Sequence, residues 1–300
     1  RRNIPEARVE FHEVTRARVR ELVSFNFLNA LGTVNYSLFM QAPVFVMRHD
    51  LHLVGLYGIA LQINSIVRGF FFSGHSALLP LMVTLNSKKD SKGLMALFVV
   101  STKFFLASSV IVWAWLAIVG PDILALWLGS QQDLSDLIYA LPLLVLVTST
   151  AIGSMPAAAL AVTMEKLNIT EAVGGILVIA MMTSLFVVVE PSVLCKIAAL
   201  QALFFGLYCL SQTLVTVRCL RMGYLEAVLD LVLRPIIPGL LAGSLLLFGH
   251  GLGSLLPKTE LVLLTVLAML VFAVTFWFQT IGSQERMLIV SGMRFSGPNK

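Results

Sequence analysis

The sequence predicts an all-α fold, a polytopic bundle of about eight membrane-spanning helices. Two features of the composition indicate this class. Apolar residues make up 58% of the chain and charged residues only 12%, whereas soluble domains carry about 25% charged residues. The third observation is the spacing of the apolar segments, because most are long enough to supply the roughly 20 residues that a spanning helix needs. The mean hydropathy of +0.90 agrees with this class.

The chain divides into five segments by charge and hydropathy. Residues 1–21 mix arginines with glutamates, as expected of a charged linker at the cytoplasmic surface. Six spans are expected within 22–217, at about 22–47, 53–80, 94–119, 137–163, 172–189 and 193–217. The remainder is expected to be a cytoplasmic surface linker, two additional spans and a polar cytoplasmic tail, at 218–234, 235–282 and 283–300.

The first span carries a regular set of polar side chains. They recur every three or four residues, so on a helix they form one continuous stripe, made of Asn26, Asn29, Thr33, Ser37 and Gln41. Amides that face lipid find no hydrogen-bond partner, so this stripe is expected to face a protein interior or an aqueous cavity. Hydrogen bonding to a neighbouring helix is the alternative.

The second span contains a single arginine, Arg68, near its middle. An arginine at that depth costs several kcal/mol and is tolerated mainly where it faces protein or water. Asn64 and His75 fall on the same side of the helix. Arg68 is therefore the main candidate for a functional residue, with a structural tie to backbone carbonyls or to a carboxylate as the alternative.

A basic loop at 86–93 leads into the third span. Lys103 lies near the start of that span, so its ammonium group is expected to reach back to the lipid headgroups. Pro121 is expected to end the span, and 123–129 is expected to form a short separate helix at the membrane interface. In the fourth span, Pro142 and Pro156 each remove a backbone hydrogen bond and favour a kink.

Short polar turns separate the later spans. Glu165 and Lys166 form one, and Glu190 with Pro191 forms another. Glu171 is placed close to a helix end, so no carboxylate is expected in the middle of a span.

The basic residues are distributed unevenly over the predicted loops. Most of the 21 lysines and arginines fall on the side of the two termini, while Arg48, Lys196 and Lys258 fall on the other side. Because cytoplasmic loops are enriched in lysine and arginine, both termini are expected in the cytoplasm. This placement of charge does not indicate nucleic-acid binding.

The three cysteines, Cys195, Cys209 and Cys219, show none of the spacings of a metal site and are interpreted as packing residues. No metal and no cofactor is expected. The sequence also lacks a GxxxxGK[ST] motif, which excludes an ATP-driven pump built from this chain alone.

Three short motifs carry a resemblance to a known family. They are ALLP at 77–80 before the basic loop, ILALWLG at 123–129, and PAAAL at 156–160 ahead of a tight turn. With the order of the spans, they resemble the C-terminal half of bacterial polysaccharide and oligosaccharide flippases, members of the multidrug/oligosaccharidyl-lipid/polysaccharide exporter superfamily. At 164–168 the sequence reads MEKLN, where the family has a glycine-containing basic turn.

The resemblance implies a transporter of two six-helix lobes plus two extra C-terminal helices in the bacterial inner membrane. This chain would be the second lobe with the extra pair, and the first lobe would precede Arg1. The implied activity is translocation of polyprenyl-pyrophosphate-linked oligosaccharide, a precursor of O-antigen or exopolysaccharide, by alternating access. Partners would be the lipid-linked glycan, membrane lipids, the missing N-terminal lobe and polysaccharide polymerase machinery.

The candidate site follows from this resemblance together with the residues themselves. A buried guanidinium offers charge and paired hydrogen bonds to a pyrophosphate, so Arg68, with Asn64 and His75, is assigned to that group. The stripe on the first span is assigned to the sugar hydroxyls.

Two other functions remain open. One is a cation-coupled drug or metabolite antiporter of the same superfamily, which usually needs a carboxylate inside the membrane. The other is a membrane-embedded enzyme acting on lipid-linked sugars, with acid/base chemistry at Arg48, His49, Asp50 and His52. The predicted outer loops are only a few residues long, and the chain has no DxD-like or HExxH-like cluster. The favoured interpretation is therefore that the chain is not an enzyme.

Overall fold

The computed structural model of the chain describes residues 15–129, 133–188, 194–252 and 258–282, and within these ranges it contains helices and turns but no strand. The α-helices are α1 (Arg16–Met47), α2 (Leu51–Ser87), α3 (Ser91–Leu128), α4 (Ser135–Thr163), α5 (Leu167–Val188), α6 (Leu194–Cys219), α7 (Tyr224–Ala227), α8 (Arg234–Leu252) and α9 (Lys258–Thr275). Two π-helical segments, η3 (Val228–Leu233) and η4 (Phe276–Thr280), follow α7 and α9. The all-α prediction is confirmed.

The described part of the chain contains six helices that are long and apolar enough to cross a membrane. They are Leu51–Ser87, Ser91–Leu128, Ser135–Thr163, Leu167–Val187, Leu194–Cys219 and Tyr224–His250. A shorter apolar helix covers Thr265–Thr280. The chain is therefore a membrane-embedded helix bundle, as the composition predicts.

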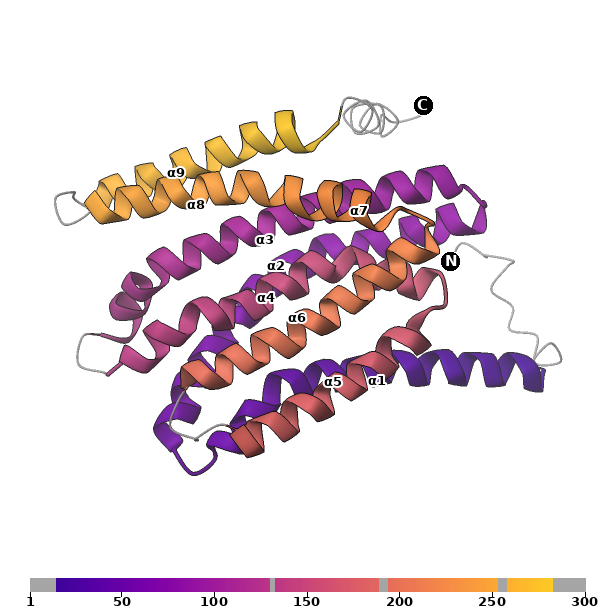
Figure 1. Ribbon diagram of the computed structural model, residues 1–300, viewed down its shortest axis with the longest axis horizontal. Helices are drawn as coiled ribbons and strands as arrows, with labels where there is room; N and C mark the ends of the chain where they lie inside the picture. Colours follow the sequence, from indigo (N-terminus) through magenta and orange to yellow (C-terminus); the bar gives the residue numbers. More distant parts are fainter. Residues whose placement is uncertain (1–14, 130–132, 189–193, 253–257, 283–300) are drawn as a thin grey trace, which may run out of the picture.

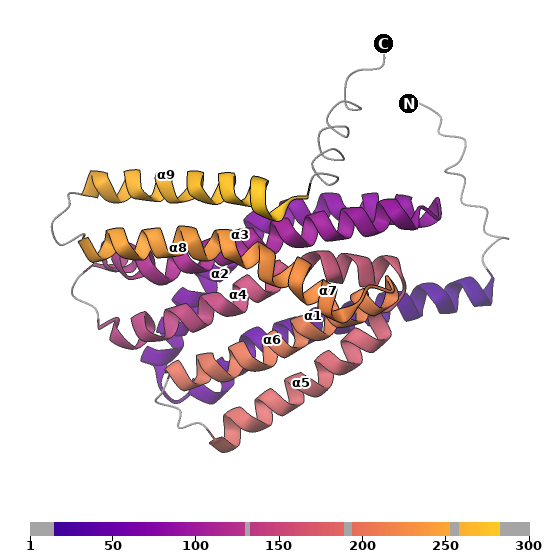
Figure 2. The ribbon, with the colours of Figure 1, turned by 45° about the horizontal axis from the view of Figure 1, so that its top comes forward.

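The long helices lie side by side and alternate in direction (Figure 1). The four-residue turn after α6, the turn between α2 and α3 and the turn between α4 and α5 all lie at the same end of the bundle. Helix α4 lies in the interior, where it packs against α2, α3 and α6. Helices α1 and α5 pack together on one side, and the hairpin of α8 and α9 covers α3 on the other (Figure 2).

Acidic side chains begin three of these helices. Asp50 Oδ1 accepts hydrogen bonds from the backbone N–H groups of His52 and Leu53 at the start of α2, and Asp90 Oδ1 accepts one from Gly93 in α3. Before α4, the hydroxyl and N–H of Ser135 both donate to Asp133 Oδ1 and hold the pKa of that carboxyl below its usual value. Each carboxylate satisfies amide groups that a helix start leaves unpaired.

Two predicted boundaries were wrong. Helix α3 does not end at Pro121 but continues through it to Leu128, so 123–129 is not a separate interfacial helix. Leu124 is fully buried in the main core, and this packing keeps the helix together where the proline removes one backbone bond. After α6, the next apolar helix begins at Tyr224 rather than at Pro235. Most of the segment that was expected to be a surface linker is therefore continuous with α8.

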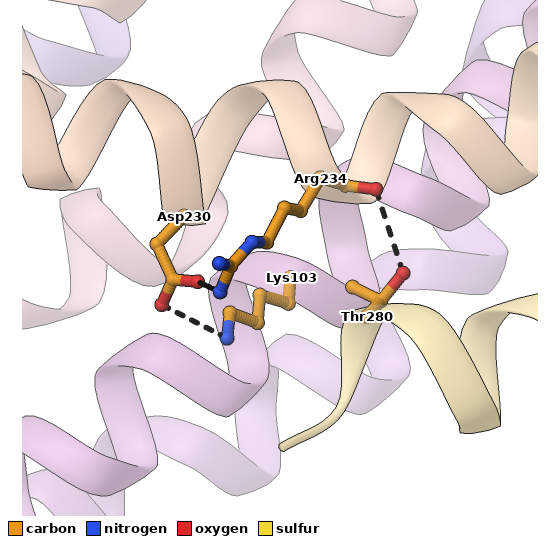
Figure 3. A network of polar contacts seen from close by, with 4 residues as sticks. All are labelled: Lys103, Asp230, Arg234 and Thr280. Atoms are coloured by element: carbon orange, nitrogen blue, oxygen red, sulfur yellow. Dashed lines mark hydrogen bonds and ion pairs between the residues drawn. The ribbon is translucent and has the colours of Figure 1, made fainter.

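The prediction for Lys103 was also wrong. Its side chain does not reach toward headgroups: the residue is 2% exposed, and its Nζ lies 3.0 Å from Asp230 Oδ2 of η3 (Figure 3). The second carboxylate oxygen of Asp230 pairs with Arg234. Thr280 Oγ1 of η4 lies 3.5 Å from the backbone carbonyl oxygen of Arg234. These contacts connect α3 to η3, and connect η4 to the start of α8.

Small residues let α8 approach α3 closely. A Cβ atom added at Gly239 would lie 2.5 Å from Val110 Cγ1, and one at Gly243 would lie 2.8 Å from Ala114 Cβ. Ala242, between them, is fully buried. The GxxxG spacing is typical of membrane helices that pack with their backbones close together.

A buried polar cluster ties α1, α2 and α6 together. The Tyr57 hydroxyl lies 2.6 Å from the carbonyl oxygen of Met40, and Gln201 Nε2 donates to the carbonyl oxygen of Phe39 (3.0 Å) and to the Tyr57 hydroxyl (2.9 Å). Tyr57 and Gln201 are 0% and 1% exposed. Their hydrogen bonds replace those that water would otherwise supply.

We expect Gln201→Ala to lower the free energy of unfolding by about 1–3 kcal/mol, since it leaves buried polar groups without a partner. A thermal unfolding curve in mild detergent measures the effect. Thr183→Ala is the control, because Thr183 lies on the exposed face of α5 and bonds only within its own helix. Equal unfolding temperatures for the two variants would contradict the prediction.

Candidate functional site

Arg68 lies in the middle of α2 and is directed at α1. Its guanidinium carbon lies 3.7 Å from the centroid of the Tyr36 ring, which is cation–π geometry. Its Nε is buried and has no hydrogen-bond partner among the described residues. No carboxylate in the described part of the chain forms an ion pair with it. The guanidinium is therefore held by an aromatic face and keeps hydrogen-bonding capacity for another group.

Two cavities meet at this pair. The first has a volume of about 340 Å³ and lies between α1, α2, α4, α5 and α6; its lining includes Asn29, Thr33, His75, Glu171 and Tyr208. The second has a volume of about 720 Å³ and is lined by α1 and α2, with Gln41, Gln62, Asn64 and Ser65 among its residues. Tyr36, Arg68 and Phe72 line both cavities. Arg68 can thus be reached from either side.

The predicted stripe on α1 is exposed over its whole length. Asn29 and Thr33 line the smaller cavity and Gln41 lines the larger one, whereas Asn26 and Ser37 line neither of these two. Asn26 and Thr33 each donate a hydrogen bond within α1 itself, to the carbonyls of Leu22 and Asn29. No hydrogen bond joins the stripe to another helix in the described part of the chain. The stripe is therefore a polar surface beside the cavities.

His75 and Asn64 differ in what they contact. His75 lines the smaller cavity with Arg68, and its Nδ1 is buried without a hydrogen-bond partner in the described structure. Asn64 is 8% exposed, and its Nδ2 lies 3.4 Å from the carbonyl oxygen of Leu144 in α4. Asn64 therefore contributes to the packing of α2 on α4. It lines the larger cavity, whereas His75 lines the smaller one, so the two residues do not share a pocket.

Sequence reasoning missed a buried carboxylate in the smaller cavity. Glu171, in the second turn of α5, is 3% exposed. Asn35 Nδ2 donates to its Oε2 and to its backbone carbonyl, each at 3.0 Å, and the Tyr208 hydroxyl lies 3.0 Å from both carboxylate oxygens. Glu171 lies near a helix end, as expected, but its burial was not foreseen: α5 begins five residues earlier than expected, which places this carboxylate inside the helix and against α1 and α6.

Two glycines make room for the Glu171 cluster. A Cβ at Gly32 of α1 would lie 3.0 Å from Glu171 Cδ, and one at Gly174 of α5 would lie 2.7 Å from a Tyr208 ring carbon and 2.9 Å from Asn35 Nδ2. Helices α1, α5 and α6 therefore approach each other closely at this point. Asn35 lies two residues from Thr33 and from Ser37, about 200° around the helix, so it is on the buried face of α1 opposite the exposed stripe, and the stripe pattern did not identify it.

The polar residues at the start of α2 and the three cysteines lie outside the two cavities that Arg68 lines, apart from Cys209. Asp50 caps α2 through its Oδ1, and Arg48 Nε donates to the neighbouring His49 ring. Cys195, Cys209 and Cys219 are unpaired, and Cys209 lines the smaller cavity. Among the described residues no group of three or more histidine, cysteine or acidic side chains is placed to hold a metal ion.

Comparison of the chain with models of protein families, with curated proteins and with solved structures found no match. The candidate site therefore has to be interpreted from its own geometry.

Proposed function

We propose that this chain is part of a membrane transporter that moves a polyprenyl-pyrophosphate-linked oligosaccharide across the bacterial inner membrane by alternating access. The observation that carries the proposal is Arg68: a cation inside an apolar bundle, lining two cavities, with a buried N–H that lacks a partner in the described structure. A buried polar group of this kind is normally satisfied by a ligand or by water.

The surroundings of Arg68 suit an anionic head joined to an uncharged polar part. A guanidinium binds phosphate oxygens through directed, charge-assisted hydrogen bonds. His75 lines the same cavity, while carboxamide and hydroxyl groups of Gln41, Gln62 and Ser65 line the other. Neutral groups of this type can bind sugar hydroxyls without requiring charge on the sugar. We therefore assign pyrophosphate to Arg68 and the glycan to the neutral cavity and the α1 stripe.

The same proposal includes the topology. Eight crossings, with α1 and α9 as the first and last, place the basic residues of the turns after α2, α4 and α6 at one end of the bundle. By the positive-inside rule that end is the cytoplasmic one. The open polar face of α1 would then face a second lobe, which supplies the other wall of the transport path. A polysaccharide polymerase would use the translocated product.

A second candidate function is favoured by one specific observation. Glu171 places a carboxylate in the cavity that Arg68 lines, and proton- or sodium-driven exchange usually uses an acidic group inside the membrane. The alternative is therefore a cation-coupled antiporter for a drug or metabolite. The presence of Glu171 is also compatible with ion-coupled glycan transport.

The test is a comparison of Arg68→Ala with Arg68→Lys in the full-length natural protein. We expect Arg68→Ala to reduce export of lipid-linked glycan roughly tenfold or more, because a charged hydrogen bond to the pyrophosphate is lost, and Arg68→Lys to retain part of the activity, because the charge remains. Surface glycan and membrane protein levels are measured together in a strain that lacks the natural gene.

Arg48→Ala is the matched control, since it removes an exposed arginine that lines neither cavity. Full complementation by both Arg68 variants would rule out the pyrophosphate assignment. Loss of drug resistance without any change in glycan export would favour the antiporter.

A further inference from the structure

The C-terminal hairpin contacts α3 through a series of paired positions. Lys103 pairs with Asp230, Val110 and Ala114 meet Gly239 and Gly243, and Asp122 Oδ2 lies 3.0 Å from His250 Nε2. The partners advance together along both helices, so α8 runs parallel to α3, as both ribbon views show (Figures 1 and 2).

The two polar pairs lie at opposite ends of this contact. From Lys103 to Asp122, α3 rises about 29 Å at 1.5 Å per residue. The hydrocarbon core of a bilayer is about 30 Å thick. The stretch between the pairs is apolar and closely packed, with Ile111, Ala242 and Leu246 in one buried cluster. The contact therefore matches one crossing of the membrane, with a polar pair near each boundary.

Lys103 makes this contact more than ordinary apolar packing. Its side chain is 3% exposed, and the Asp230 carboxylate that faces it belongs to the hairpin. A lysine buried without a counter-charge is among the most costly arrangements in a bilayer. Helices α1 to α6 place this lysine on the face of α3 that the hairpin covers, and the hairpin brings the carboxylate.

Apolar packing alone leaves the register of α8 on α3 poorly defined. Two glycines four residues apart on α8 meet the apolar residues Val110 and Ala114, also four apart, on α3, and a shift by one turn, about 5.4 Å, still brings apolar helical faces together. Such a shift would separate both Lys103 from Asp230 and Asp122 from His250. A buried polar residue can select one register of packed helices at a cost in stability.

We propose that Lys103 and Asp230 are the register lock of the C-terminal hairpin: the pair makes the hairpin an obligatory partner of α3 and fixes the level at which α8 crosses the membrane. The π-helical turn η3 serves this lock by presenting Asp230 to α3 just before α8 begins (Figure 3). Arg234, which is 63% exposed, pairs with the same carboxylate from the outside. This inference does not depend on the substrate of the transporter.

The test uses a specific protease site inserted after Arg221, an exposed residue in the short turn between α6 and α7. After cleavage of the purified full chain in mild detergent, the hairpin should stay bound to α1–α6. Asp230→Asn should weaken this association about 100-fold, because it removes the carboxylate charge that faces the buried Lys103 ammonium group. The double variant Lys103→Met with Asp230→Leu should restore it, because both charges are then absent.

Arg234→Gln is the matched control, since it removes the exposed partner of Asp230 and leaves Lys103 paired; we expect the cleaved hairpin to remain bound. Retention of the hairpin in Asp230→Asn at the natural level would overturn the proposal. So would a double variant as weak as the single one, because the loss would then not come from removing the charge that Asp230 places opposite Lys103.

Discussion

Replacing Glu171 by alanine is expected to lower the free energy of unfolding by about 2–4 kcal/mol. The carboxylate accepts hydrogen bonds from Asn35 and Tyr208, both of which are buried. Alanine removes the acceptor of the Tyr208 hydroxyl and of one Asn35 N–H, while Asn35 keeps its bond to the backbone carbonyl of residue 171; each lost acceptor costs about 1–3 kcal/mol. The measurement is the unfolding free energy, or the midpoint of thermal unfolding, of the purified protein in mild detergent.

Glu171→Gln separates packing from charge. Its carboxamide oxygen can still accept from Asn35 or Tyr208, so we expect it to recover more than half of the stability that alanine loses. If Glu171 also carries a coupling ion, Glu171→Gln should still lose transport driven by a proton or sodium gradient, because the carboxylate charge is gone. Glu226→Ala, at an exposed acidic residue of α7, is the control. A stability of Glu171→Ala equal to that of this control would show that the cluster contributes little.

Replacing Gly239 by alanine is expected to destabilise the contact of α8 with α3 by about 1–3 kcal/mol, the usual cost of overpacking. The added Cβ would lie 2.5 Å from Val110 Cγ1 and 3.3 Å from the backbone nitrogen of Ile111. The valine side chain can move, but the backbone of α3 cannot do so without separating the helices. Thermal unfolding of the full chain measures the effect.

Two further variants make this prediction specific. Gly206→Ala in α6 is the matched control: a Cβ there meets nothing within 4 Å, so the change should be neutral or stabilising by up to about 1 kcal/mol through helix propensity. Val110→Ala combined with Gly239→Ala should recover part of the loss, since it removes Val110 Cγ1, the nearest clashing atom, although Val110 Cβ remains 2.7 Å away. If Gly239→Ala were as stable as Gly206→Ala, the two helices would not be in close contact.

The long apolar segments predicted the helices well because lipid imposes a strong constraint on composition and length. The predicted helix boundaries were wrong near the ends of the apolar segments, where the lipid constrains the sequence least. Pro121 was expected to end a helix on local grounds, yet packing of Leu124 in the main core keeps α3 intact. The mixed-charge segment at 218–234 was expected to be a surface helix, yet from Tyr224 onward it leads directly into α8.

The candidate site was predictable only in part. Arg68 was identified because a single cation in an apolar segment is conspicuous, and the α1 stripe because its period matches that of a helix. Glu171 and Asp230 were missed because each lies in a segment that reads as polar by sequence. Their surroundings come from neighbours more than 30 residues away: Asn35 and Tyr208 around the buried Glu171, and Lys103 beside the half-buried Asp230.

The sequence by itself determined that this protein is a membrane-embedded helical bundle, that one helix carries a continuous polar stripe and that one arginine lies in the middle of an apolar segment. These properties depend on composition and on helical period, which are local. Only the tertiary structure decided which charges are paired: Lys103 with Asp230, while Arg68 faces Tyr36 and two cavities. The physical reason is that the free energy of a buried charge depends on which group lies within a few ångströms of it, and that neighbour comes from a distant part of the chain.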